Sequence, residues 1–128
     1  MESYVAEFVG TCLLIILGDG VVANVVLART KGHDSGWIVI TAGWGLAVAV
    51  AVYCVGRISG AHINPAVTVG LATIGQFPWT DVIPYLLAQM VGAFVGAVIV
   101  WASYARHFAA TDDGPTKLAV FATGPEIR

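Results

Sequence analysis

The chain has 128 residues, of which 58% are hydrophobic and 11% are charged, and its mean hydropathy is +0.83. Soluble domains carry about 25% charged residues, so this composition excludes an ordinary soluble protein and indicates a membrane protein. The net charge is −2 and the six Lys and Arg residues are scattered. A nucleic-acid partner is therefore not expected, because nucleic-acid binding needs a basic patch.

The first apolar segment, from about residue 4 to residue 27, is long enough to span a bilayer. No basic region or cleavage site marks it as a signal peptide, so we expect a retained membrane helix. It carries two carboxylates, Glu7 and Asp19. Carboxylates inside membrane segments usually face a bundle interior or a cavity. From the residues alone, Glu7 is either such a residue or a solvated one near the helix start, and the role of Asp19 stays open.

The second apolar segment, residues 37–55, would be about 28 Å long as a helix and fits the hydrocarbon core. Trp44 lies about two turns inside it, between Gly43 and Gly45. Two flanking glycines would clear space on either side of the large ring. Trp44 therefore either lines an internal path or faces lipid.

A shorter element follows, from Asn64 to about residue 74. Asn is a preferred N-cap residue, and Pro65 is pre-set for the first helical position. Such a helix is roughly 15 Å long, half of a ~30 Å hydrocarbon core. A helix that starts at membrane depth leaves polar backbone groups that only protein or water can satisfy. The sequence therefore predicts a re-entrant half-helix beside a pathway.

The third span covers about residues 82–104 and carries a face of small residues that permits close helix approach. These are Gly92, Ala93, Gly96 and Ala97. Residues 107–128 are polar and predict an extramembrane loop without a packing element.

Several motifs in this order resemble the N-terminal half of the aquaporin and glycerol-facilitator family, the major intrinsic proteins, and most of all bacterial glycerol uptake facilitators. The motifs are Gly60–Gly70 with its Asn-Pro-Ala box at 64–66, Ala6–Thr11, Gly43–Gly45, and Gln89 with Gly92 and Gly96. The resemblance implies an all-α membrane protein with three transmembrane helices and one re-entrant half-helix, half of an inverted-repeat right-handed bundle. Residues 1–106 would form the first repeat, and 107–128 would connect to a second repeat with its own Asn-Pro-Ala box, which is absent here.

The same resemblance implies roles for individual residues. Asn64 and the carbonyls of the segment before it would line a pore, with Trp44 as the apolar wall of its narrowest part, where water-selective relatives more often have Phe. The carbonyls belong to Gly60, Ala61, His62 and Ile63. Pro65, Ala66 and Glu7 would support the pore loop, Glu7 by accepting hydrogen bonds from its backbone. His62 has no partner at metal-ligand spacing, so no metal is expected.

The function implied is passive diffusion of glycerol and other small neutral solutes, with water, through a channel that is not an enzyme and needs no cofactor. A water-selective channel and a non-conducting membrane protein with an assembly role are the alternatives. Three spans cannot enclose a pore alone, so a second half or another copy is needed. We expect a fragment of a longer protein rather than a self-pairing half, with complete channels as homotetramers in the plasma or inner membrane. The loop charges weakly favour an outside N-terminus, whereas the family places it in the cytoplasm.

Overall fold

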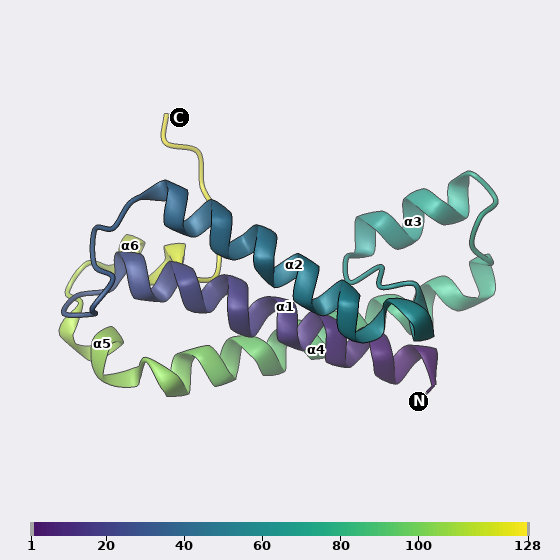
Figure 1. Ribbon diagram of the computed structural model, residues 1–128, viewed down its shortest axis with the longest axis horizontal. Coiled ribbons are helices and arrows are strands. Elements are labelled where there is room, and N and C mark those ends of the chain that lie inside the picture. Colours follow the sequence, from purple (N-terminus) through teal and green to yellow (C-terminus); the bar gives the residue numbers. More distant parts are fainter. Residues whose placement is uncertain (1, 128) are drawn as a thin grey trace.

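The computed structural model describes residues 2–127 and contains within them six helices and no strands (Figure 1). The helices are α1 Ser3–Val26, α2 Trp37–Ser59, α3 Pro65–Thr73, α4 Trp79–Ser103, α5 Ala105–Ala110 and α6 Gly114–Ala119. By length and composition, α1, α2 and α4 can each cross a membrane. The expected fold, three spans and a half-helix, is confirmed.

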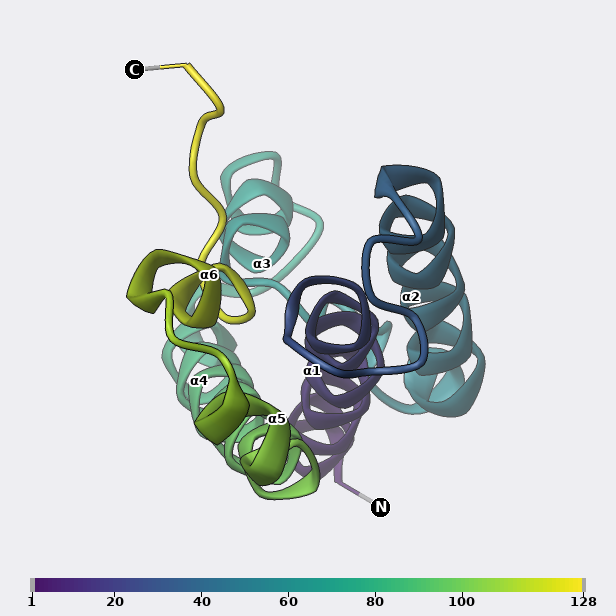
Figure 2. The same cartoon turned by 90° about the vertical axis from the view of Figure 1, so that its left-hand side faces the viewer.

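The long helix α1 is the centre of the structure. It packs against both α2 and α4, and α3 packs against α4 (Figure 2). The half-helix α3 and the N-terminus lie at one end of the molecule, while α5 and α6 lie at the other (Figure 1). The segment between α2 and α3 therefore reaches α1 and α4 from one end.

Glycines set how closely α1 approaches its two neighbours. A Cβ atom on Gly92 would lie 2.4 Å from the backbone oxygen of Phe8, and one on Gly96 would lie 2.8 Å from that of Cys12. A Cβ atom on Gly10, on the other side of α1, would lie 2.6 Å from Val55 of α2. The expected close packing through Gly92 and Gly96 is confirmed, because a larger side chain would force the helices apart.

Two of the spans are longer than the sequence predicts. Helix α2 continues four residues past the expected end at residue 55 and stops only at Gly60, whose φ of +85° is the left-handed conformation of a helix C-cap. Arg57, which the expected end at residue 55 would place in the connection, therefore lies in the last turn of α2. Helix α4 begins directly after Pro78, three residues before the expected start at residue 82, with Asp81 in its first turn near the positive end of the helix dipole. The half-helix itself differs from the expected 64–74 by one residue at each end.

The polar segment after α4 is not a plain loop, and the expectation that it lacks a packing element was wrong. Phe108 and Val120 are buried in one cluster with residues of α1 and α4, and the rings of Phe108 and Phe121 stack at 5.7 Å. The other members of the cluster are Ala23, Leu27 and Val100. A few apolar side chains among polar ones are enough to dock short helices on the bundle end.

Helix α6 owes its start to Asp113. The carboxylate accepts hydrogen bonds from the backbone N–H and the hydroxyl of Thr116. These bonds hold the pKa of Asp113 below its usual range, because they favour the charged form. Asp113 is thus an N-cap that stays ionised well into mildly acidic conditions.

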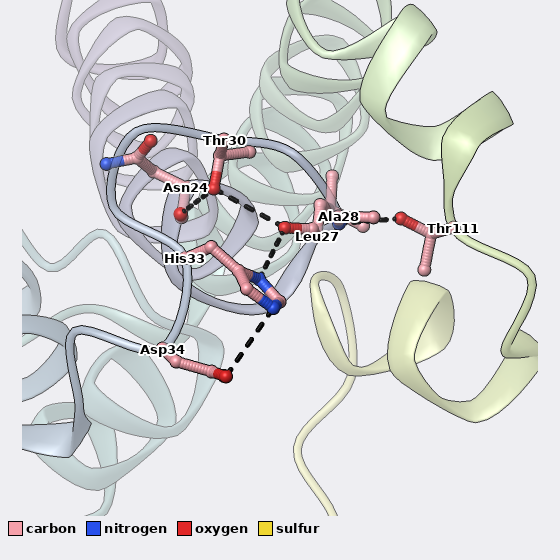
Figure 3. A network of polar contacts seen from close by, with 7 residues as sticks. All are labelled: Asn24, Leu27, Ala28, Thr30, His33, Asp34 and Thr111. Carbon is pink, nitrogen blue, oxygen red and sulfur yellow. Dashed lines mark hydrogen bonds and ion pairs between the residues drawn. The ribbon is translucent and has the colours of Figure 1, made fainter.

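The connection between α1 and α2 is tied to the segment after α4 through Ala28 (Figure 3). The Ala28 N–H donates to Thr111 Oγ1 at 2.9 Å. The Ala28 carbonyl lies 3.1 Å from Nδ1 of His107, which the figure does not draw. A second histidine, His33, places its Nδ1 2.8 Å from the Leu27 carbonyl. A carbonyl only accepts, so each imidazole carries its proton on Nδ1. These bonds pair polar groups that the end of α1 would otherwise leave open.

Substituting Thr111 with Val tests this tie. Val keeps the size of Thr but leaves the partly buried Ala28 N–H without its acceptor, which costs about 1 kcal/mol. We expect faster hydrogen exchange at the Ala28 amide and a lower melting midpoint, with glycerol and water permeability unchanged. Thr73→Val is a matched control, because the Thr73 hydroxyl bonds only to its own helix at Gly70 and is exposed. An Ala28 amide as protected as in the wild type would contradict the prediction.

Candidate functional site: the re-entrant segment

The re-entrant segment, residues 60–64, connects α2 to α3 with an unusual backbone. Gly60, Ala61 and Ile63 all have positive φ, at 85°, 49° and 44°. For residues other than glycine this conformation costs on the order of 1–3 kcal/mol each, and it is least favourable for a β-branched residue such as Ile. The segment keeps this shape only because its surroundings hold it there.

Glu7 of α1 is the main support. Its Oε1 accepts the His62 N–H at 2.9 Å and the Ser59 hydroxyl at 2.6 Å, and its Oε2 accepts the Ile63 N–H at 2.7 Å and a Gln89 side-chain N–H at 2.8 Å. The Glu7 side chain has no exposed surface. A carboxylate has about four acceptor positions, and here each is met by a donor. Burying the charge is tolerable for that reason.

The bonds from Glu7 reach three separate elements. Ser59 is the last residue of α2, His62 and Ile63 belong to the re-entrant segment, and Gln89 is in the middle of α4. Ser59 adds two further bonds: its hydroxyl accepts the Ala61 N–H at 3.1 Å, and its carbonyl accepts the Tyr85 hydroxyl at 2.9 Å. One buried carboxylate thus joins α1, α2, α4 and the segment.

His62 is held by its side chain as well as by its backbone. Its ring lies between those of Phe77 and Tyr85, at centroid distances of 4.7 and 5.0 Å, and its Nδ1 lies 2.9 Å from Thr68 Oγ1. Thr68 Oγ1 also accepts an N–H from Gln89 at 3.0 Å. The imidazole is therefore a packing residue beside the segment, and it shares its hydrogen-bond network with Glu7.

The carbonyl groups of residues 60–63, unlike the backbone N–H groups of the same residues, lack hydrogen-bond partners among the described residues. Those of Gly60, Ala61, His62 and Ile63 accept no hydrogen bond from any residue between 2 and 127. Buried or membrane-depth carbonyls are normally paired with protein or water. Four successive unpaired acceptors are therefore available to water or to a solute with hydroxyl groups.

Asn64 ends this row of acceptors with a donor. Its Oδ1 accepts the Ala66 N–H at 2.8 Å, capping α3, and Pro65 is the first residue of the helix. Because Oδ1 must be the acceptor of this bond, the amide NH₂ is the free group, and within residues 2–127 it donates no hydrogen bond. Asn64 is exposed. A donor next to acceptors at a helix N-terminus can bind both ends of a hydroxyl group.

Trp44 lies apart from this segment. It is half-buried on the face of α2 that packs on α1, and its ring covers Gly18: a Cβ atom there would lie 2.4 Å from the indole. Gly18 is eleven residues beyond Glu7, about 16 Å along α1. Of the two flanking glycines, Gly43 packs on Val21 and Gly45 has open space beside it. That both clear space for the adjoining ring stays a prediction, and Gly18 on the facing helix provides room as well.

The structure brings most of the predicted site residues together around the re-entrant segment, whereas Trp44 lies about 16 Å further along α1, beside Gly18. Sequence reasoning missed Ser59, Thr68 and Tyr85, which complete the support of the segment. All three are common in membrane helices, so their residue type is a weak signal. Gln89 is a stronger one, because a buried amide in the middle of a span needs polar partners.

This architecture defines a multi-span membrane protein organised around a half-helix, α3, that is preceded by four carbonyls without a partner among residues 2–127. The chain belongs to the major intrinsic protein family: the family's model matches residues 1–124. The resemblance read from the motifs is thereby confirmed, and the fold is that of the first half of such a protein.

Several curated relatives of this chain are named as glycerol uptake facilitators. The chain is 69% identical over 128 residues to a probable glycerol uptake facilitator protein of Thermotoga maritima, covering all of this chain and 55% of the relative. It is 54% identical over 127 residues to the glycerol uptake facilitator protein of Bacillus subtilis, covering 99% and 46%. The chain thus spans about half the length of the curated relatives it matches.

A solved structure agrees with the fold. The aquaglyceroporin of Plasmodium falciparum superposes with a TM-score of 0.78 at 37% sequence identity, over 84% of this chain and 43% of that one. The similarity again extends over about half of the other protein.

Proposed function

We propose that this chain supplies the first half of a channel through which glycerol, other small neutral solutes and water diffuse passively across the cell membrane. The observation that carries the proposal is the row of four unpaired carbonyls in residues 60–63, which ends at the free amide of Asn64. The relatives named as glycerol uptake facilitators support the choice of solute. A channel of this kind performs no covalent step and uses no cofactor.

The geometry suits a neutral solute with hydroxyl groups. Each hydroxyl can donate to a carbonyl of the segment and accept from Asn64, so the solute exchanges hydrogen bonds stepwise as it moves. An ion would need its whole hydration shell replaced, and a cation is also repelled by the positive end of the α3 dipole. Glu7 acts on this wall only indirectly, because all its acceptor positions are already used to hold the segment.

Trp44 would form the apolar side of the path nearer the other end of α1. Its indole would contact the carbon backbone of a polyol, while water gains nothing from that surface. A second half, corresponding to the part of the relatives beyond the matched region, would supply the opposite wall, the second half-helix and the remaining selectivity residues. We propose that the complete channels assemble as homotetramers.

The direct test is solute flux in vesicles that contain the whole protein. The intact mass of the polypeptide from its native membrane should first be measured, and we expect a value near twice the 13.3 kDa of this chain. Purified protein in proteoliposomes should then speed glycerol and water entry well above empty vesicles, by stopped-flow light scattering. Glycerol entry no faster than in empty vesicles would overturn the proposal in favour of a water-selective or non-conducting protein.

Trp44→Phe tests the apolar wall. The smaller ring removes apolar contact with the carbon backbone of glycerol, and contact differences of this size change selectivity by about tenfold. We expect the ratio of glycerol to water permeability to fall about tenfold, with the protein yield unchanged. Trp101→Phe is the matched control, because Trp101 is exposed on α4. An unchanged ratio in the Trp44 variant would count against a role in selectivity.

A further inference from the structure

Asp19 is the second carboxylate buried in α1, and its surroundings are unlike those of Glu7. The residue is 6% exposed, yet its carboxylate forms no hydrogen bond and no ion pair with any residue between 2 and 127. Glu7, on the same helix, has four donors. Residues 2–127 therefore supply hydrogen-bond donors to the Glu7 carboxylate but none to the Asp19 carboxylate.

The position of Asp19 on α1 follows from its neighbours one turn away. Ile15 contacts the position of Gly96, and Ala23 packs in a cluster with Val100 and Val120. Residues four apart share a helix face, so Asp19 lies between them on the face toward α4. It is also next to Gly18, at the level of Trp44, and about 10 Å along the axis from the end of α1.

No residue between 2 and 127 gives this carboxylate a donor or a counter-charge. The residues that pack against Ile15 and Ala23, one turn to either side, include Gly96 and Val100 of α4 and Val120 after α6, which carry no side-chain donor, and lipid tails offer none. A carboxylate inside a membrane segment is costly unless it has a partner, and breaking a buried pair by removing one partner is strongly destabilising. A donor must therefore reach Asp19 from outside these residues.

We propose that Asp19 is a docking point for the second repeat, whose donor side chain or backbone N–H fills the acceptor positions left open here. The inference rests on the proposed function in one respect, that the chain is half of a longer channel. The relatives supply the length: roughly half of each lies beyond the matched region. Inverted-repeat membrane proteins are built by contacts between their two halves.

This assignment separates Asp19 from the solute path. Gly18, which the Trp44 ring covers, is the adjacent residue, and adjacent residues of a helix point about 100° apart. Gly18 faces α2, and Asp19 faces α4. Asp19 is thus an assembly residue rather than a solute-contacting one.

The first experiment measures stability and selectivity together in the full-length protein. Asp19→Leu fills the site but leaves the donor of the second repeat unpaired, so the melting midpoint should fall by roughly 10 °C. Asp19→Asn, which keeps one acceptor oxygen, should lose less. The ratio of glycerol to water permeability should stay unchanged in both. Asp112→Asn is the control, because Asp112 is exposed beyond α4, and it should leave both quantities unchanged.

The second experiment asks whether water reaches the position. Asp19→Cys is made with Cys12 and Cys54 replaced by Ser, and the protein in vesicles is treated with a charged, membrane-impermeant thiol reagent on either side. No labelling is expected, because the second repeat covers the site. Labelling would overturn the proposal and assign the carboxylate to water or, if glycerol slows the reaction, to the solute path.

A melting midpoint that is unchanged or raised in Asp19→Leu would also overturn the proposal, because no donor would then depend on the carboxylate. The proposed function fails differently. A wild-type protein that conducts no glycerol, in which Asp19→Leu still lowers the midpoint, would keep the docking role and remove the channel. A double-mutant cycle between Asp19 and polar residues of the second repeat should then identify the donor as the residue with non-additive loss.

Discussion

Glu7→Gln should lower the yield of folded protein far more than it changes selectivity. The glutamine oxygen can replace one acceptor, but its NH₂ group meets donors where the second carboxylate oxygen stood. The donors left without an acceptor come from the Ile63 N–H and the Gln89 amide, or from the Ser59 hydroxyl and the His62 N–H. Leaving buried donors unpaired costs about 1–3 kcal/mol each, so a loss of roughly 3–5 kcal/mol is expected.

The strained backbone makes this loss larger than that of an ordinary hydrogen-bonded pair. Ala61 and Ile63 hold positive φ values only while the segment is anchored. We expect the fraction of monodisperse protein in detergent to drop sharply and the remainder to melt at a lower temperature. Glu2→Gln is the control, because Glu2 is exposed just before α1. Normal yield together with an altered glycerol-to-water ratio would mean that Glu7 contacts the path instead of supporting it.

Gly92→Ala should be the most damaging single-methyl substitution between α1 and α4. The added Cβ atom would lie 2.4 Å from the backbone oxygen of Phe8, and a backbone atom cannot rotate away as a side chain does. The helices must therefore separate locally, which overpacking studies put at about 1–3 kcal/mol or more. Because Phe8 adjoins Glu7, the separation also disturbs the bond between Glu7 and Gln89.

The matched control for Gly92 is Gly20→Ala. Gly20 lies in α1 with open space around its Cα, and Ala is favoured over Gly in a helix by about 1 kcal/mol. Melting curves of the two variants should therefore move in opposite directions from the wild type. A Gly92→Ala protein that melts like the wild type would show that the two helices are free to move apart at this level.

Local chemistry was enough to predict the half-helix and the spans. The Asn-Pro start of α3 depends on one side-chain bond and one ring, both within two residues of the helix end. The expected C-terminus of α2 was four residues too early and the expected N-terminus of α4 three residues too late, because the apolar pattern is weak in these terminal turns. Gly60 and Pro78 mark the real ends. The short helices after α4 were missed, because two buried side chains among polar ones leave no periodic pattern.

The class of membrane protein, the three spans, the half-helix and its cap can be predicted from the sequence, since they follow from apolar length and from residues adjacent in the chain. The hydrogen bonds that satisfy Glu7 depend on tertiary structure, because their donors come from positions 52 to 82 residues away. The packing of α2 on α1 also places Gly18 under the ring of Trp44. Such contacts depend on how the helices cross, and the residue pattern of one helix does not identify which residues of other helices pack against it.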